Sequence, residues 1–309
     1  MFAKCSSLIN VTNLFKTNSN ITIGMSSFFG MFSGCTSLRT APTLPTTTLT
    51  SGCYQNMFAG CSSLTGVPTS YLSSTNLAAH CYAGMFSGCT SMTNATKLPA
   101  TTLASSCYAG MFAGCSSLVY TLGWFNFPAT TAPNCYASMF ARTKSIVNSS
   151  NALPALTMTS GCYASMFQAT SGLGTVPTLP ATTLAPSCYY QMFRAAKFTS
   201  ANQSITLPAT TLVDSCYASM FYDCSGVVSA FISATVIPDA STMNWMFWGC
   251  KNLAYVEVNF TSWPSGGFPY WLASVSSTGT FKCPSKLPHT STYLNKSNYI
   301  PQGWTVVTK

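Results

Sequence analysis

The sequence predicts an α/β solenoid, an array of about ten coils that each contain a strand, a corner and a short helix. A Met-Phe pair recurs at steps of 26–30 residues, and repeats of this length are typical of solenoids and arrays. Hydrophobic residues make up 47% of the 309 residues, enough for a continuous core. Charged residues make up only 6%, so Ser, Thr and Asn must supply the solvated surface. The pairs begin at Met1, Met31, Met57, Met85, Met111, Met139, Met166, Met192, Met220 and Met246.

The segment CYAGMFAGC represents the repeat and predicts its helix. Cys107, Met111 and Cys115 are spaced i, i+4 and i+8, and Tyr108 and Phe112 are spaced i and i+4. Such spacings place side chains on one side of a short helix. A serine before the segment can cap the helix, and a glycine near its end favours termination. We therefore expect these side chains to form the inner wall of a coil and not a reaction centre.

A short strand and a corner follow each predicted helix. An apolar residue seven positions after Met, such as Leu118, marks the strand. A Leu-Pro corner such as Leu98-Pro99 ends the strand, because proline cannot donate to a ladder. About five large side chains per coil stabilise it by ~1.5–3 kcal/mol each. Ordering each backbone residue costs ~1–2 kcal/mol, so one coil is unstable alone and the coils must stack.

The period divides the chain into two predicted domains. Residues 1–255 form the solenoid, and residues 256–309 break the period and are rich in Trp, Tyr and Pro. We expect the second region to be a β-rich C-terminal cap that shields the last apolar face. The alternative is a small separate binding module.

Fifteen cysteines fall mainly into two columns, four residues before Met and four residues after it. Three repeats keep the first cysteine but replace the second with Thr143, Thr170 or Ala196. Disulfide partners should be lost together, and these are not. The pattern predicts small, buried, free thiols, and disulfides between coils are the alternative.

The sequence contains little that could catalyse a reaction. Its two histidines, His80 and His289, stand apart, and four acidic residues form no recognisable pair. The cysteine spacings do not match common zinc sites. We therefore predict no enzyme activity, no catalytic residues, no metal site and no cofactor.

The chain ends and the charge distribution bear on partners and location. No Lys and Arg run suggests nucleic-acid binding, and no apolar stretch reaches the roughly 18 residues of a membrane helix. The first residues do not form a signal peptide and begin inside a repeat without a cap. We expect an upstream segment or an N-terminal partner there. The oligomeric state stays open.

Two groups of residues are candidates for binding. The segment VYTLGWFNFP places Tyr120, Trp124 and Phe125 where other coils have small polar residues, and clustered aromatics are enriched at interface anchors. The alternative is that some of them fill an irregular coil. A second group consists of lysines that lie five residues after Met, in every second coil. They could face an anionic partner, and the alternative is a row of solvated side chains. These are Lys144, Lys197 and Lys251.

The repeat resembles the BspA-like leucine-rich repeats of gut and oral bacteria and some of their phages. The resemblance covers about residues 1–255, although the period is longer than expected for that family and the asparagine of ordinary leucine-rich repeats is absent. It implies a leucine-rich-repeat-like, right-handed array. It also implies a non-enzymatic adhesion protein that binds a protein or glycan partner at the cell surface or outside the cell. The alternative is a phage virion protein of the tail or receptor-binding type. The matching residues are Met111-Phe112, Cys115, Leu118 and Phe127-Pro128.

Overall fold

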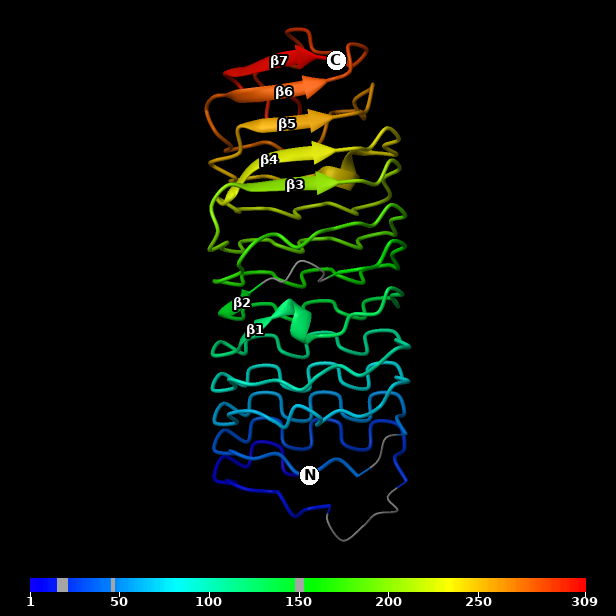
Figure 1. The fold of residues 1–309 in the computed structure, drawn as a ribbon, viewed down its shortest axis with the longest axis vertical. Coiled ribbons are helices and arrows are strands. Elements are labelled where there is room, and N and C mark those ends of the chain that lie inside the picture. The colour runs from blue at the N-terminus through cyan, green and yellow to red at the C-terminus, as the bar shows by residue number, and fades with distance from the viewer. Residues whose placement is uncertain (16–21, 46–47, 148–152) are drawn as a thin grey trace.

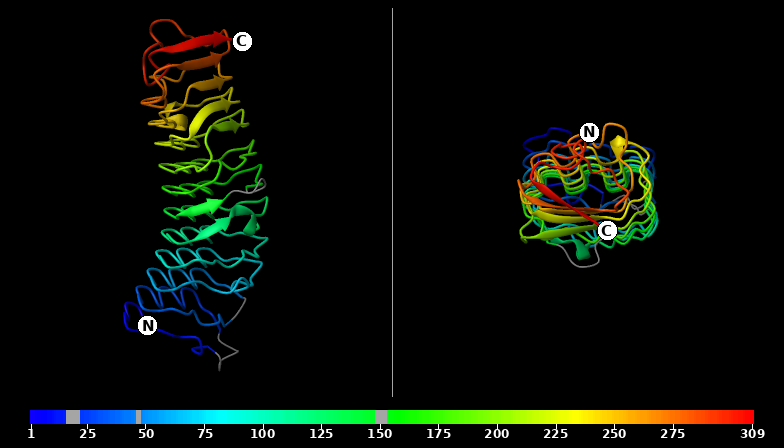
Figure 2. Two further views of the ribbon diagram at one scale, coloured as in Figure 1. Left: turned by 60° about the vertical axis from the view of Figure 1, so that its left-hand side comes forward. Right: turned by 90° about the horizontal axis from the view of Figure 1, so that it is seen from above.

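The computed structural model is a parallel β-solenoid, whose turns stack along one long axis (Figure 1). It describes residues 1–15, 22–45, 48–147 and 153–309. The chain enters at one end of the stack, and its last strands lie at the other end (Figure 2). The prediction of a stacked repeat array is confirmed.

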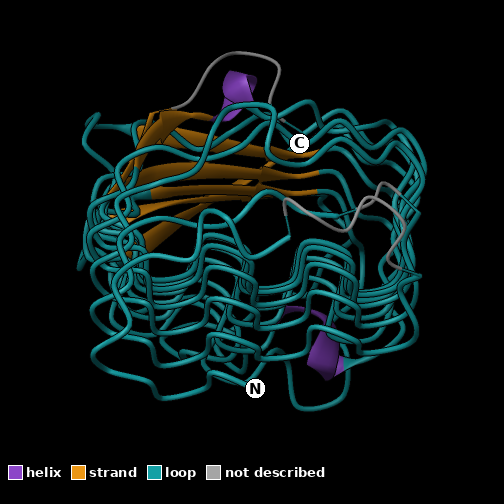
Figure 3. Cartoon of the chain, turned by 90° about the horizontal axis from the view of Figure 1, so that it is seen from below, coloured by secondary structure: helices purple, strands orange, loops and turns teal. Residues whose placement is uncertain are grey.

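Regular strands occupy one side of the stack, opposite a crenellated ribbon of turns (Figure 3). Every strand pairing is parallel, in a two-stranded sheet, β1-β2, and a five-stranded sheet, β3-β4-β5-β6-β7. The larger sheet continues across the predicted domain boundary at 255, where β5 begins. Elsewhere in the described residues only isolated bridges replace strands, so an array of ten strand-bearing coils is not confirmed. The strands are β1 (Val119–Thr121), β2 (Ser145–Val147), β3 (Gln203–Leu207), β4 (Val227–Ile232), β5 (Tyr255–Val258), β6 (Gly279–Cys283) and β7 (Trp304–Thr308).

The prediction of short helices is wrong, because the Met-Phe segments form ribbons of consecutive β-turns. The amides of Cys107, Met111 and Cys115 each donate to the carbonyl three residues earlier, at 3.1–3.2 Å. Every second amide, at the even-numbered positions from 108 to 114, donates instead to the next turn of the solenoid, as Phe112 N does to Met139 O at 3.0 Å. An α-helix would send each amide to the carbonyl four residues earlier. Within the described residues, the only helices are two short 3₁₀ segments, η1 (Leu122–Trp124) and η2 (Ala240–Met243).

A residue whose backbone adopts the left-handed conformation, with positive φ, occurs at every fourth position and creates the ribbon. Ser106, Gly110 and Gly114 have φ values of 52°, 61° and 73°. Each is the third residue of a four-residue turn, as in type II turns, which require positive φ there. Glycine adopts this conformation without steric cost. A strict period of four thus produces the same i, i+4 spacing that predicted a helix.

Two columns of stacked aromatic rings run through the core. In the phenylalanine column, successive ring centroids lie 5.2–5.9 Å apart with planes within 5–11° of parallel. In the second column the separations are 5.4–6.1 Å. Offset ring stacking adds to the hydrophobic gain of burial, so each turn stabilises the next. The first column contains Phe2, Phe32, Phe58, Phe86, Phe112, Phe140, Phe167, Phe193, Phe221 and Phe247, and the second Phe28, Tyr54, Tyr82, Tyr108, Tyr136, Tyr163, Tyr189 and Tyr217.

The cysteines that lie four residues after Met donate hydrogen bonds between turns. The Cys115 thiol donates to Phe86 O at 3.1 Å, and the same contact recurs from Cys61, at 3.1 Å, and from Cys250, at 3.0 Å. Where threonine replaces cysteine, Thr170 Oγ1 donates to Phe140 O at 3.0 Å. Thr170 therefore supplies the same bond between turns as cysteine, whereas Thr143 donates to Phe140 O of its own turn at 2.8 Å and Ala196 has no side-chain donor. The column selects a small side chain.

We expect one fast-reacting thiol in the native protein and fifteen after unfolding. All fifteen cysteines are free, and all but Cys5 are buried. Burial raises the pKa of Cys115 to about 12, so the reactive thiolate is scarce at neutral pH. Maleimide labelling of native and denatured chain, without reductant and followed by mass spectrometry, measures both counts. A denatured count below fifteen, or several fast thiols in the native state, would contradict this arrangement.

The C-terminal residues close the last ribbon. Phe268 N donates to Asn298 O, and Tyr270 N donates to the Asn298 side chain, both at 2.9 Å. The Trp271 indole donates to Tyr299 O at 2.8 Å. Asn298 thus satisfies two backbone amides that the ribbon would otherwise direct at a further turn.

Glu257 on β5 connects this region to the sheet. Its carboxylate accepts from Lys309 Nζ at 2.6 Å and from the Tyr255 hydroxyl at 2.7 Å, and Lys282 Nζ lies 3.4 Å away. The Lys309 hydrogen bond, followed by that of Tyr255, lowers the pKa of Glu257 to about 2.

Glu257→Gln should reduce the stability of the protein at neutral pH but not at strongly acidic pH. The folded-state pKa lies below the ordinary value of 4.5, so the ionised carboxylate stabilises the fold fully above about pH 4.5. That contribution is lost as the pH falls towards about 2. Denaturant unfolding from pH 7 to pH 2 should show the difference between wild type and variant shrinking across this window. A difference that is constant with pH would show that the charge of Glu257 does not stabilise the fold.

Candidate binding site

The predicted aromatic residues gather beside β1 and η1. The Tyr120 hydroxyl accepts from Ala95 N at 2.8 Å, and its ring lies 5.4 Å from that of Trp124. Phe125 is only 3% exposed and packs 5.0 Å from Phe140 in the core column. Phe125 thus belongs to the core, while Tyr120 and Trp124 are half-buried.

Trp124 keeps two features of a binding residue. Lys97 Nζ lies 5.1 Å from the centroid of its ring, within cation–π range. Its indole Nε1 is buried and has no hydrogen-bond partner among the described residues. The cluster thus offers one unpaired donor beside a cation–π contact.

The three predicted lysines are exposed and lie in one column along the corner that follows the ribbon. Ser171 occupies the turn between two of them, and its hydroxyl donates to Lys144 O at 3.1 Å. Lys197 lines a cleft of about 700 Å³, together with Asp223 and Asn252. Lys251 precedes Asn252 in the chain, whereas Lys144 lies away from this cleft.

A larger group of aromatic side chains, half-buried except for the exposed Tyr270, lies on the outer face of the ribbon near the C-terminal end. Arg194 lies 4.7 Å from the Tyr222 ring centroid, and that ring stacks on Trp248 at 4.5 Å. Beside them Trp245 stacks on Tyr270 at 4.4 Å, with Tyr270 47% exposed. We call Arg194, Tyr222, Trp245, Trp248 and Tyr270 the outer aromatic cluster.

The fold does not require large side chains at these positions. Tyr222 and Trp248 occupy the position directly after Phe of the Met-Phe pair. Other turns have small residues there, including Ala59, Ala113 and Ala141. The bulk of the outer aromatic cluster is therefore additional to what stacking of the turns needs.

Two members of the cluster adopt an unfavourable backbone conformation. Trp245 has φ 57° and Tyr270 has φ 54°, whereas the equivalent residues of earlier turns include Gly84, Gly110 and Ser138. A bulky residue in the left-handed region is an outlier that costs about 1–3 kcal/mol, and such strain clusters at functional sites. The two aromatic side chains are thus retained at a cost in stability.

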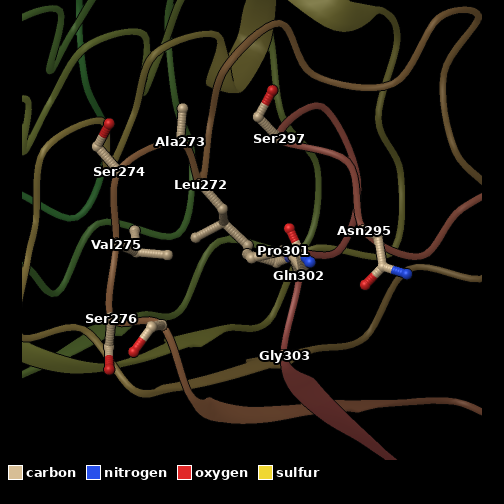
Figure 4. Close-up of a pocket in the computed structure, with 11 residues that line it drawn as sticks. Leu272, Ala273, Ser274, Val275, Ser276, Asn295, Ser297, Pro301, Gln302 and Gly303 are labelled. Carbon is tan, nitrogen blue, oxygen red and sulfur yellow. The ribbon is translucent and has the colours of Figure 1, made fainter.

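A polar hollow of about 560 Å³ lies one turn beyond Trp248 (Figure 4). Gly249 N donates to Ala273 O at 2.9 Å, which places Ala273 in the same column as Trp248. Ala273 and Ser274 form one side of the hollow, and Asn295 and Gln302 lie across from them. The whole lining is Leu272, Ala273, Ser274, Val275, Ser276, Ser277, Asn295, Ser297, Pro301, Gln302 and Gly303, with no ionisable side chain.

Aromatic rings, hydroxyls and amides suit binding by stacking and hydrogen bonding. Within the described residues, no three His, Cys, Asp or Glu side chains are grouped so as to hold a metal ion. No helix in the described part of the chain is long and apolar enough to span a membrane.

The sequence contained a signal for the outer aromatic cluster that the analysis of the Met-Phe pairs missed. Alignment of the repeats by Met-Phe shows small residues after Phe in early turns and Arg194, Tyr222 and Trp248 in three successive late ones. The periodic core residues predicted the inner wall. The candidate site is indicated instead by turns in which a large residue replaces the usual small one after the Met-Phe pair.

Comparison of the chain with protein-family models, with curated proteins and with solved structures found no match.

Proposed function

We propose that this chain is a non-enzymatic binding protein that presents its repeat surface to a protein or glycan partner at the cell surface. The observation that carries the proposal is the outer aromatic cluster. Trp, Tyr and Arg are enriched among the residues that dominate the energetics of binding surfaces. Trp and Tyr bury a large area with only two rotatable side-chain bonds. Here they occupy positions where small residues suffice for the fold, and two of them are strained.

The resemblance of the repeat to BspA-like sequences supports the location and the adhesive role. Fold alone does not define function, so the binding role rests on the cluster and the location on the resemblance. The exposed Lys197 and Lys251 flank the same corner and extend the proposed contact surface beyond the aromatic residues.

A variant that removes the cluster tests the proposal. Tyr222→Ala, Trp248→Ala, Trp245→Ser and Tyr270→Ser together introduce residue types that the same columns contain elsewhere, so the fold should survive. The wild-type chain and this variant are applied to a printed glycan array and to an array of purified cell-surface proteins.

We expect the wild type to bind at least one probe on the arrays. The variant should bind that probe at least tenfold more weakly. Phe231→Thr is the matched control, because Phe231 is a half-buried aromatic residue on the outer side of β4, away from the cluster. Equal retention of wild type and cluster variant, or no retention of wild type on either array, would overturn the proposal.

A phage virion protein of the tail or receptor-binding type is the second candidate. The free, buried thiols favour it, because such thiols are usual in proteins that fold in a reducing cytoplasm. Mass spectrometry of purified phage particles from the same source tests it: peptides of this chain would support the virion assignment, and their absence would oppose it.

A further inference from the structure

We propose that the polar hollow beyond Trp248 binds a neutral saccharide. This inference rests on the proposed function and names the partner class for that surface. The hollow lies where the last ribbon, residues 272–277, meets the C-terminal segment 295–303 (Figure 4). Its volume of about 560 Å³ is within the range of small-molecule sites.

The lining favours an uncharged, hydroxyl-rich ligand. Ser274, Ser276 and Ser297 provide hydroxyls, and Asn295 and Gln302 provide amides that both donate and accept hydrogen bonds. Sugar hydroxyls likewise donate and accept, so they can pair with such groups. An anionic ligand would lack an ionic partner here, because the lining contains no Lys, Arg or His.

Trp248 does not line the hollow, but it precedes the lining residue Ala273 by one turn in the same column. One face of its ring stacks on Tyr222 at 4.5 Å. The next position of the same column is Ala273, which has no ring and also lines the hollow. The column thus gives Trp248 no stacked ring on its second side among the described residues, and the Trp245 ring lies 6.3 Å away and tilted by 51°. A saccharide that extends from the hollow along this column would place the C–H face of a pyranose on that side of Trp248.

Asp214, Asp223 and Asp239 offset the charges of Arg194, Lys197 and Lys251 in these turns, which argues against a polyanion such as single-stranded nucleic acid. Asp223 lies on the neighbouring cleft, one residue after Tyr222 of the cluster. In the adjoining turns, the carboxylates of Asp214 and Asp239 both accept hydrogen bonds from Ser241. A backbone-binding groove for a polyanion would need an excess of Lys and Arg instead.

The hollow can be blocked without removal of any contact. Ala273→Tyr extends the aromatic column into the site, in a position that accepts Tyr222 and Trp248 in earlier turns. Ala113→Tyr is the matched control, because Ala113 occupies the same column in a distant turn. Gln302→Ala removes one exposed amide from the lining and leaves the column unchanged.

Calorimetry and tryptophan fluorescence on the full chain then measure binding of cellotriose, maltotriose, mannotriose and chitotriose, with sialyllactose and a decathymidylate as anionic probes. We expect at least one neutral trisaccharide to bind, with affinity reduced tenfold or more by Ala273→Tyr, reduced several-fold by Gln302→Ala and unchanged by Ala113→Tyr. Neutral binding that Ala273→Tyr leaves intact, or binding of the anionic probes alone, would overturn the inference.

The outcomes separate this inference from the proposed function. If no trisaccharide binds, but the wild type binds a protein on the array that the cluster variant does not bind, the saccharide site is wrong and the binding function stands. If neither experiment detects a ligand, both fail.

Discussion

Phe112→Ala should lower the free energy of unfolding by about 3–5 kcal/mol, the range for truncation of a buried phenylalanine. The Phe112 ring is fully buried and stacks on Phe86 at 5.8 Å and on Phe140 at 5.9 Å. Its loss opens a cavity and breaks the column in the middle of the stack. Urea unfolding followed by circular dichroism measures the loss.

Tyr108→Phe is the control for this prediction. The Tyr108 hydroxyl is buried and has no hydrogen-bond partner among the described residues. Removal of a buried, unpaired hydroxyl should leave stability unchanged or raise it by up to about 1 kcal/mol. A Phe112→Ala loss below about 1 kcal/mol, or a large loss for Tyr108→Phe, would show that the column does not carry the stability.

Gly267→Ala should detach the C-terminal segment from the last ribbon. Gly267 has φ 73°, and a Cβ there would overlap the carbonyl oxygen of Asn298 and lie 2.7 Å from the Tyr299 ring. That carbonyl accepts from Phe268 N. We expect a loss of about 1–2 kcal/mol from the backbone conformation and of about 1–3 kcal/mol from the steric overlap.

Gly266→Ala provides the matched control. Gly266 has φ 78°, but no atom lies within 4 Å of its added Cβ, so only the conformational cost applies. Hydrogen exchange at the Phe268 and Leu272 amides should accelerate strongly in Gly267→Ala and only slightly in Gly266→Ala. Equal effects of the two substitutions would contradict the described contact between the cap and the ribbon.

The sequence was sufficient to predict the stacking of the repeats and the inner wall. Met111, Phe112 and Cys115 are fully buried, as their recurrence predicted. The local conformation was not predicted, because a helix and a ribbon of turns both place residues i and i+4 on one side. Gly110 and Gly114, four residues apart inside the segment, were the distinguishing signal, since glycine in a helix interior costs about 1 kcal/mol.

The binding role of the predicted lysines and aromatic residues stays a prediction, and the outer aromatic cluster and the hollow were not among the predicted sites. The lysine column does pass the cleft that Lys197 lines, but Phe125 belongs to the core. The polar hollow could not be read from the sequence, because it forms between residues 272–277 and 295–303, and no periodic pattern aligns these segments. Its position depends on how the C-terminal segment closes the last ribbon.

The most direct test of this account asks which carbonyl accepts the hydrogen bond of the Phe112 amide. Scalar coupling across hydrogen bonds, measured by NMR on isotope-labelled protein, identifies that acceptor. The stacked ribbon predicts a coupling between Phe112 N and the carbonyl carbon of Met139, whose oxygen lies 3.0 Å away in the next turn. A coupling from Phe112 N to the carbonyl of Tyr108, four residues earlier as in a helix, would contradict it.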